Sequence, residues 1–324
     1  MRIRLPVLLV PFLLSAMLSP AGAFAQAFPM RTVRIIVPGG TGTSLDVAAR
    51  EIAQKVQEDW GSPVVVENRA GAGNSIGTEA VAKSAPDGHT WLLAPYNVLV
   101  VNPHMLKNAG DPLKDFAPIT TVAYVPFVVV VHPTIPANNI RELIAVAKAK
   151  PGSINFASTG PGSAQHLGAE LFKSLTGVDI VHVPYKAGPT VITDLLAGRV
   201  QLYFGAVNSL LPHIRSGALR ALAFASPKRD SSVVDLPTVA ESGVPEFAMG
   251  TWNSVVVPAG VPTDVITKIH GAVVKTLTTP EIRTRLANQG IMVDTNTPQE
   301  FAALIQKEYA VYAKLIKTIG LKSE

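Results

Sequence analysis

The chain contains no cysteine among its 324 residues. This absence excludes disulfide bonds, thiol chemistry and a cysteine-linked lipid anchor, so packed apolar cores must stabilise the fold. Histidine is also scarce, and the 7 histidines never stand at metal-ligand spacing on one helix. Without cysteine a zinc site would depend on scattered histidines and carboxylates, so we expect no metal.

Long apolar runs are missing except at the N-terminus. Two arginines among residues 1–4 precede an almost wholly apolar run from Leu5 to Leu18, and Ala23-Phe24-Ala25 follows. This is the layout of a secretory signal peptide, and the run is shorter than the roughly 20 residues that a spanning helix needs. The sequence therefore predicts cleavage after Ala25, with Ala27 as the alternative, and a soluble mature protein in the periplasm.

Charge of either sign is sparse and scattered. The 28 basic and 23 acidic residues give a formal net charge of +5, without a basic block or interleaved aromatic residues. We therefore expect no nucleic-acid partner, and the mild basicity favours anionic ligands only in a general way. A mature chain of this length exceeds what one hydrophobic core usually serves, which predicts two domains.

Short β-branched runs alternate with amphipathic helical patterns, which indicates βαβ units and two doubly wound sheets. The expected strands are residues 33–37, 64–67, 90–94, 128–131, 154–157, 180–183, 201–204 and 255–257. The expected helices are residues 44–60, 75–83, 140–148, 164–175 and 190–196, and three more that open at Pro262, Pro280 and Pro298 because proline suits a first helical position.

Residues 38–46 form a glycine-rich loop between a predicted strand and a predicted helix. Glycine lets the backbone approach a ligand closely, and the free amides and positive dipole end of the helix attract an anion. A carboxylate fits such a loop without any positive side chain. A turn that only caps its helix explains the same residues equally well, because Thr43 and Asp46 have capping-box spacing.

A second loop of the same kind, residues 158–163, precedes the helix that contains His166. In doubly wound sheets ligands bind outside the carboxyl ends of the strands, where both loops lie, so the two loops suggest opposing jaws. Ser163 is predicted as an N-cap, a role that is compatible with ligand contact. His166 is a candidate donor to a carboxylate, although an isolated histidine in a first turn is as often a satisfied surface residue.

Enzyme signatures are weak. Residues 71–77 space their glycines one residue off the dinucleotide fingerprint, and no Walker lysine or nucleophile elbow accompanies either glycine-rich loop. Asp46 and Asp194 would be an acid–base pair, but positions at a helix start and in a helix interior explain them equally well. We therefore expect no enzyme and no cofactor.

The order and spacing of several short motifs resemble the substrate-binding proteins of tripartite tricarboxylate transporters, the Bug family, over nearly the whole mature chain. These motifs are Val66-Glu67-Asn68-Arg69 with Gly71 and Gly73, Pro86-Asp87-Gly88, Asn155-Phe156-Ala157-Ser158-Thr159-Gly160, His166-Leu167, His182-Val183-Pro184-Tyr185-Lys186, Asp194-Leu195-Leu196-Ala197-Gly198-Arg199, Arg220-Ala221-Leu222-Ala223 and Pro237-Thr238-Val239-Ala240-Glu241-Ser242-Gly243.

This resemblance implies a two-lobed periplasmic-binding-protein fold of type II, α/β in class, with a mixed sheet flanked by helices in each lobe. After the signal peptide, residues 1–25, it places residues 26–125 and 251–324 in lobe 1 and residues 126–250 in lobe 2. It further implies a carboxylate held mainly by loop amides and water, and delivery to the membrane permease subunits of a tripartite tricarboxylate transporter. We expect a monomer.

The chain departs from the family pattern at two places. Gly39 follows Pro38 where a bulky residue is usual, and Thr43 stands in place of a second glycine. Gly205 and Ala206 replace a polar residue after the strand that ends at 204, which suggests a roomier and less polar pocket. The sequence therefore leaves open a dicarboxylate, a tricarboxylate, an amino acid or an aromatic acid.

The predicted ligand-binding residues come from both loops and from four further segments. They are Gly40, Thr41, Gly42, Thr43, Ser44, Asp46, Asn97, Ser158, Thr159, Gly160, Gly162, Ser163, His166, Tyr185, Lys186, Ala206 and Trp252. Two other functions remain in play: a binding module of the same fold that serves a sensor or another transporter, and, more weakly, a periplasmic α/β enzyme.

Overall fold

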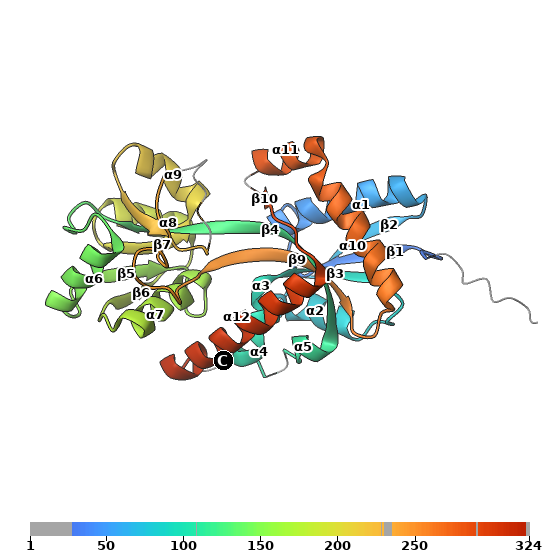
Figure 1. Ribbon diagram of the computed structural model, residues 1–324, viewed down its shortest axis with the longest axis horizontal. Helices are drawn as coiled ribbons and strands as arrows, with labels where there is room; N and C mark the ends of the chain where they lie inside the picture. The colour runs from blue at the N-terminus through green and yellow to red at the C-terminus, as the bar shows by residue number, and fades with distance from the viewer. Residues whose placement is uncertain (1–27, 108, 228, 230–234, 290, 322–324) are drawn as a thin grey trace, which may run out of the picture.

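The computed structural model describes residues 28–107, 109–227, 229, 235–289 and 291–321. Two lobes lie side by side and are joined by two long strands (Figure 1). The predicted signal peptide lies outside the described residues. Among the helices of the described chain, none is long and apolar enough to cross a membrane.

The first lobe is built on a mixed sheet. Its strands, in spatial order, are β2 (Val64–Asn68), β1 (Val33–Val37), β3 (Thr90–Pro95), β9 (Gly250–Pro258), β4 (Phe116–Val131) and β10 (Met292–Val293). The first three are parallel, whereas β9, β4 and β10 each pair antiparallel with their neighbour. This combination is the expected mixed sheet.

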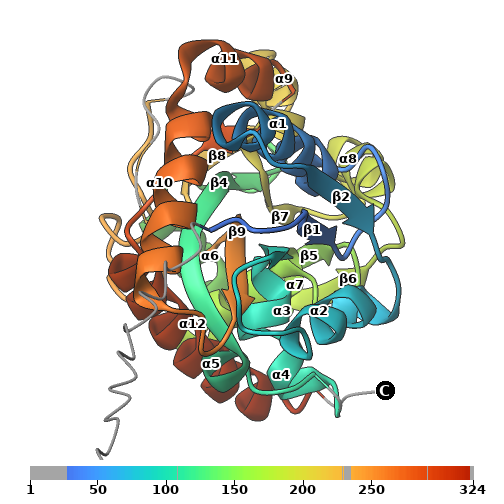
Figure 2. The same ribbon diagram turned by 90° about the vertical axis from the view of Figure 1, so that its right-hand side faces the viewer.

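Helices cover both faces of this sheet (Figure 2). One face is covered by α1 (Ser44–Trp60), α10 (Thr263–Thr278) and α11 (Pro280–Asn288). The other face is covered by α2 (Ser75–Ala82), α3 (Tyr96–Val100) and α12 (Pro298–Ile319). Three short helical segments complete this lobe: η1 (Ala72–Asn74) before α2, and α4 (Asn102–Met105) and α5 (Pro112–Asp115) between α3 and β4. Successive side chains of a strand point to opposite faces, so Ile35 packs in the core with α1 and Ile36 in the core with α2.

The second lobe repeats this arrangement with fewer strands. Its strands, in spatial order, are β6 (Val181–Pro184), β5 (Asn155–Ser158), β7 (Leu202–Ala206), the far end of β4, and β8 (Arg220–Phe224). Its helices are α6 (Ile140–Ala149), α7 (Ala164–Thr176), α8 (Gly188–Leu196) and α9 (Val207–Arg215). The cores place α6 and α7 on one face and α8 and α9 on the other.

Strands β4 and β9 connect the lobes. They pair along most of β9, with Tyr124 opposite Trp252 and Pro126 opposite Gly250, and from Phe127 onward β4 pairs instead with β7 and β8. The predicted boundaries at 125/126 and 250/251 fall within these strands, and the division into two domains stays a prediction. Helix α12 contacts both β4 and α7, so the C-terminal segment packs against both lobes.

Three features differ from the sequence-based expectation. The strand expected at 128–131 is only the end of β4, which begins twelve residues earlier at Phe116. Pro262 is the N-cap of α10 and not its first helical residue, whereas Pro280 and Pro298 do open their helices. Strands β8 and β10, helix α9 and the short helices after β3 were not predicted.

Candidate functional site

The two glycine-rich loops occupy equivalent places in the two lobes. Each follows the carboxyl end of an inner strand, β1 in the first lobe and β5 in the second, and each leads into a long helix. The second loop lies against the first lobe, because a β-carbon on Gly162 would be 2.8 Å from Cε of Met105 on α4. That the two loops form opposing jaws stays a prediction from the strand ends.

The first loop is an exposed turn anchored at its helix. Residues 40–44 are exposed, and Gly42 has a φ of 76°, a conformation that favours glycine. The hydroxyl of Thr43 donates to the Gly40 carbonyl at 2.9 Å and accepts the Asp46 amide at 3.3 Å, which caps α1. The predicted capping role of Thr43 is present in the structure.

Asp46 is used to shape this loop. Its carboxylate accepts from the Gly42 amide at 2.9 Å, from Asn68 Nδ2 at 3.0 Å and from the guanidinium of Arg50 at 2.9 and 3.0 Å. The Arg50 hydrogen bonds are the main cause that lowers the pKa of Asp46 to about 2, so the carboxylate is ionised at neutral pH. Both carboxylate oxygens are engaged and the residue is only 3% exposed, so Asp46 holds the loop from its buried side.

The second loop is anchored in the same way. Gly160 and Gly162 have φ values of 116° and 77°. Ser163 caps α7 by accepting the His166 amide at 3.3 Å, and its own amide donates to the Gly160 carbonyl at 3.2 Å. Ser158 Oγ accepts the Gly160 amide at 3.0 Å and lies 2.6 Å from Nε2 of His182. Hydrogen bonds thus fix the loop at its start, its middle and its end.

His166 supports the second loop from below. Its Nδ1 accepts the Gly162 amide at 3.1 Å, and its ring stacks on His182 with ring centroids 4.1 Å apart. The His182 ring also stacks on Phe156, with centroids 4.9 Å apart. Burial lowers the pKa of His166 to about 4, with smaller contributions from His182 and Lys173. At neutral pH the ring is therefore uncharged, as an acceptor at Nδ1 must be.

The remaining predicted residues lie in different surroundings. The Tyr185 hydroxyl donates to Asp194 at 2.9 Å, and Lys186 beside it is exposed. Asn97, after β3, donates to Asn102 at 3.3 Å, while Ala206 ends β7 opposite Phe127 on β4.

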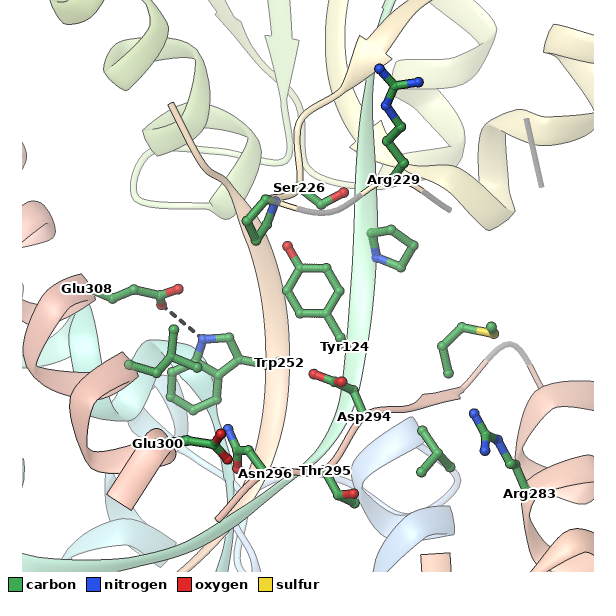
Figure 3. Close-up of a pocket in the computed structure, with 15 residues that line it drawn as sticks. Tyr124, Ser226, Arg229, Trp252, Arg283, Asp294, Thr295, Asn296, Glu300 and Glu308 are labelled. Atoms are coloured by element: carbon green, nitrogen blue, oxygen red, sulfur yellow. Dashed lines mark hydrogen bonds between the residues drawn. The ribbon is translucent and has the colours of Figure 1, made fainter. Parts of the chain in front are cut away.

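Trp252 points toward helix α12. Its indole is 2% exposed and donates to Glu308 on α12 at 2.9 Å (Figure 3). In this structure Trp252 therefore packs between the connecting strands and the C-terminal helix.

A pocket of about 730 Å³ is lined by the connecting strands β4 and β9, the segment that follows β8, strand β10 and helix α12. Figure 3 shows the Tyr124 hydroxyl pointing toward Ser226 and Glu308 directed at Trp252. Burial raises the pKa of Glu308 to about 7. Sequence patterns could not reveal this pocket, because its lining comes from segments far apart in the chain: residues 124–126, residues 226, 227 and 229, residue 252, residue 283 and residues 292–308.

The described residues give no sign of a metal centre. No group of three histidine, aspartate or glutamate side chains within the described ranges is arranged to hold an ion. The expectation of no metal stays a prediction from the residue types in the sequence.

Comparison with known proteins assigns the family. The family model for the tripartite tricarboxylate transporter family receptor matches residues 48–321. The chain belongs to this family. Protein BugT of Bordetella pertussis is 38% identical over 300 residues, which cover 92% of each chain. The resemblance to the Bug family found in the sequence motifs is therefore confirmed.

Solved structures confirm the two-lobed fold. A TctC solute-binding protein from Polaromonas, solved with no ligand, shares 26% identity and gives a TM-score of 0.84 over 90% of this chain and 99% of its own. A protein from R. palustris solved with adipate shares 32% identity and gives a TM-score of 0.69 over 92% of this chain and 100% of its own. The higher score belongs to the less identical protein, so sequence distance does not explain the difference.

Proposed function

We propose that this family member is exported to the periplasm, binds a small organic carboxylate between its lobes at the two glycine-rich loops, and delivers it to membrane permease subunits without carrying out chemistry. Family membership supports the receptor role, and the relative solved with adipate supports a carboxylate ligand. The observation that carries the proposal is that two loops of one design, one in each lobe, each connect the carboxyl end of an inner strand to the start of a long helix.

Free amides at both helix starts support an anionic ligand. The first amides of a helix have no partner within it, and the capping residues satisfy only the third one in α1 and in α7. The amides of Ser44 and Leu45, and those of Ala164 and Gln165, have no protein acceptor among the described residues. Each helix start that meets a carboxylate contributes about 0.3 to 1 kcal/mol, and up to about 2 where it is partly buried.

Side chains around the loops would complete the site. Thr41 and Ser44 can donate to further ligand oxygens, whereas the Thr159 hydroxyl already donates to Gln165 at 3.0 Å. Asn97 and Tyr185 lie on other segments of the proposed site. Lys186 is exposed and would attract an anion mainly from a distance, where solvent screens it. In this proposal Asp46 and His166 hold the loops and do not touch the ligand, and Trp252 stabilises the connecting strands.

The arrangement of the lobes supports an open, ligand-free conformation. The TM-score is 0.84 with the relative solved without ligand and 0.69 with the relative that holds adipate. We propose that residues 26–125 with 251–324 and residues 126–250 move as two bodies about residues 124–127 and 250–253, and that a monomer is the working unit. Ligand contacts made by both loops would then favour the closed state.

A thermal-shift screen tests the proposal. The mature protein is heated with malate, succinate, adipate, citrate, glutamate and benzoate, each at neutral pH. A ligand at about 100 times its dissociation constant adds roughly 2.7 kcal/mol to the free energy of unfolding, which raises the melting temperature by several degrees. Intact-mass measurement of periplasmic extract tests export, with a mass that begins at Gln26 expected. If no organic acid raises the melting temperature, carboxylate capture is refuted.

A further inference from the structure

The two binding loops share a supporting device that differs in charge. In each loop the third residue of the following helix reaches back four positions to accept a glycine amide: Asp46 accepts Gly42, and His166 accepts Gly162. Each of these two residues also donates its own amide to the capping hydroxyl. The backbone geometry is therefore the same, but the first loop is held by an anion and the second by a neutral ring.

The charge of Asp46 is compensated within its own helix. Arg50, four residues later, binds both carboxylate oxygens. The residue four positions after His166 is Glu170, which pairs with Lys173 at 2.8 Å. Position 170, the counterpart of Arg50, therefore holds no arginine that could compensate a carboxylate at position 166. The sequence of α7 fits a neutral residue at position 166.

We propose that His166 is a positioning residue that also sets the charge of the second loop: it fixes the Gly162 amide while keeping the N-terminus of α7 free of negative charge, so that a carboxylate ligand can bind there. The inference rests on the proposed function. A carboxylate at position 166 would lie within one helical turn of the Ala164 and Gln165 amides and would occupy the positive dipole end that the ligand needs.

The groups that face His166 are consistent with a neutral support. His182 on β6 stacks on it, and burial lowers the pKa of that ring as well. Lys173 on α7 lowers the pKa of His166 further, and Glu170 acts mainly on His182. Phe156 completes the stack without charge. At neutral pH the positive potential at the loop therefore comes from backbone amides and not from an imidazolium.

Two substitutions of His166, to asparagine and to aspartate, have the same shape and differ in charge. They separate the effect of the hydrogen bond to Gly162 from the effect of charge. His166→Asn keeps a neutral acceptor for the Gly162 amide, and His166→Asp keeps the acceptor but adds a negative charge. Affinity is measured by calorimetry with the acid that gives the largest thermal shift among malate, succinate, adipate, citrate, glutamate and benzoate. We expect His166→Asn to bind within about threefold of the unmodified protein and His166→Asp to bind about 30-fold more weakly or worse, from like-charge repulsion in a partly desolvated site.

A second variant tests the effect of charge without changing His166. Gln165→Glu adds a charge in the same helical turn, can still accept from the Thr159 hydroxyl, and leaves the Gly162 contact in place. We expect it to weaken binding by about tenfold. The amide proton resonance of Gly162 reports whether loop geometry survives in each variant.

Three results would overturn the inference: unchanged affinity in both charged variants, loss of binding in His166→Asn to the same degree as in His166→Asp, or a displaced Gly162 resonance in His166→Asn. The proposed function fails in a different way, because the unmodified protein would then bind none of the acids.

Discussion

Gly162→Val is the perturbation that most directly tests whether loop backbone holds the ligand. Gly162 has a φ of 77°, and a β-carbon there would lie 2.8 Å from Cε and 3.1 Å from Sδ of Met105 on α4 of the first lobe. A left-handed conformation costs an ordinary residue roughly 1 to 2 kcal/mol, and more for a β-branched one. The contact itself is less costly, because the end of a methionine side chain can move.

The expected result is a moderate loss of stability with a near-complete loss of binding. About 1 to 2 kcal/mol lowers the melting temperature of a chain of this size by only a few degrees. Binding suffers more, because the strained loop displaces the amides that follow it from the ligand. Calorimetric titration and melting curves measure the two effects separately.

Two control variants identify the cause. Gly162→Ala keeps the φ strain with a smaller side chain, and Met105→Ala removes the atoms that the new β-carbon would meet. We expect Met105→Ala to leave Gly162→Val defective, because backbone conformation and not the methionine contact is limiting. Full ligand affinity in Gly162→Val would refute the idea that loop amides hold the carboxylate.

Four further outcomes are expected. Ser163→Ala removes the cap of α7 and should cost about 0.5 to 2 kcal/mol in chemical denaturation while weakening, not abolishing, binding. Lys186→Ala should reduce affinity less than Gly162→Val does; loss of binding in the lysine variant alone would favour a salt bridge instead. Small-angle scattering should show a smaller radius of gyration with ligand, and an unchanged radius would contradict closure about β4 and β9. Glu308 has a folded pKa raised to about 7 by burial against an ordinary value of 4.5, so it binds more protons in the folded state; stability should fall as pH rises from about 4.5 to about 7, and Glu308→Gln should flatten that slope in pH-dependent denaturation.

The parts of the fold that depend on local patterns were predictable. The strand at 33–37 and the helix at 44–60 have the predicted bounds, and the helix of the second loop ends one residue later than expected. These elements carry clear apolar periodicity and end at capping residues or glycines, which are local signals.

Elements stabilised by distant partners were harder to predict. The first eleven residues of β4 contain two prolines and adjacent threonines, and they form a strand because β9 pairs with them across more than 120 residues of sequence. Strand β10 has only two residues and exists by pairing with Tyr124 and Ala123 of β4. Such pairing energies do not appear in any short window of sequence.

The candidate site shows why residue type alone could not distinguish residues that hold the loops from residues that contact the ligand. A helix cap and an anion site both require small polar residues and glycines before a helix, so Thr43, Ser163 and the residues three positions after them fit either role. The structure distinguishes these roles by the atoms already engaged. The side chains of Asp46 and His166 are committed to Gly42 and Gly162, whereas the first two amides of each helix are not. The groups left for a ligand are therefore backbone amides, whose number and direction do not change with most substitutions; ligand selectivity in this fold must then come from the few side chains that set charge and shape around them.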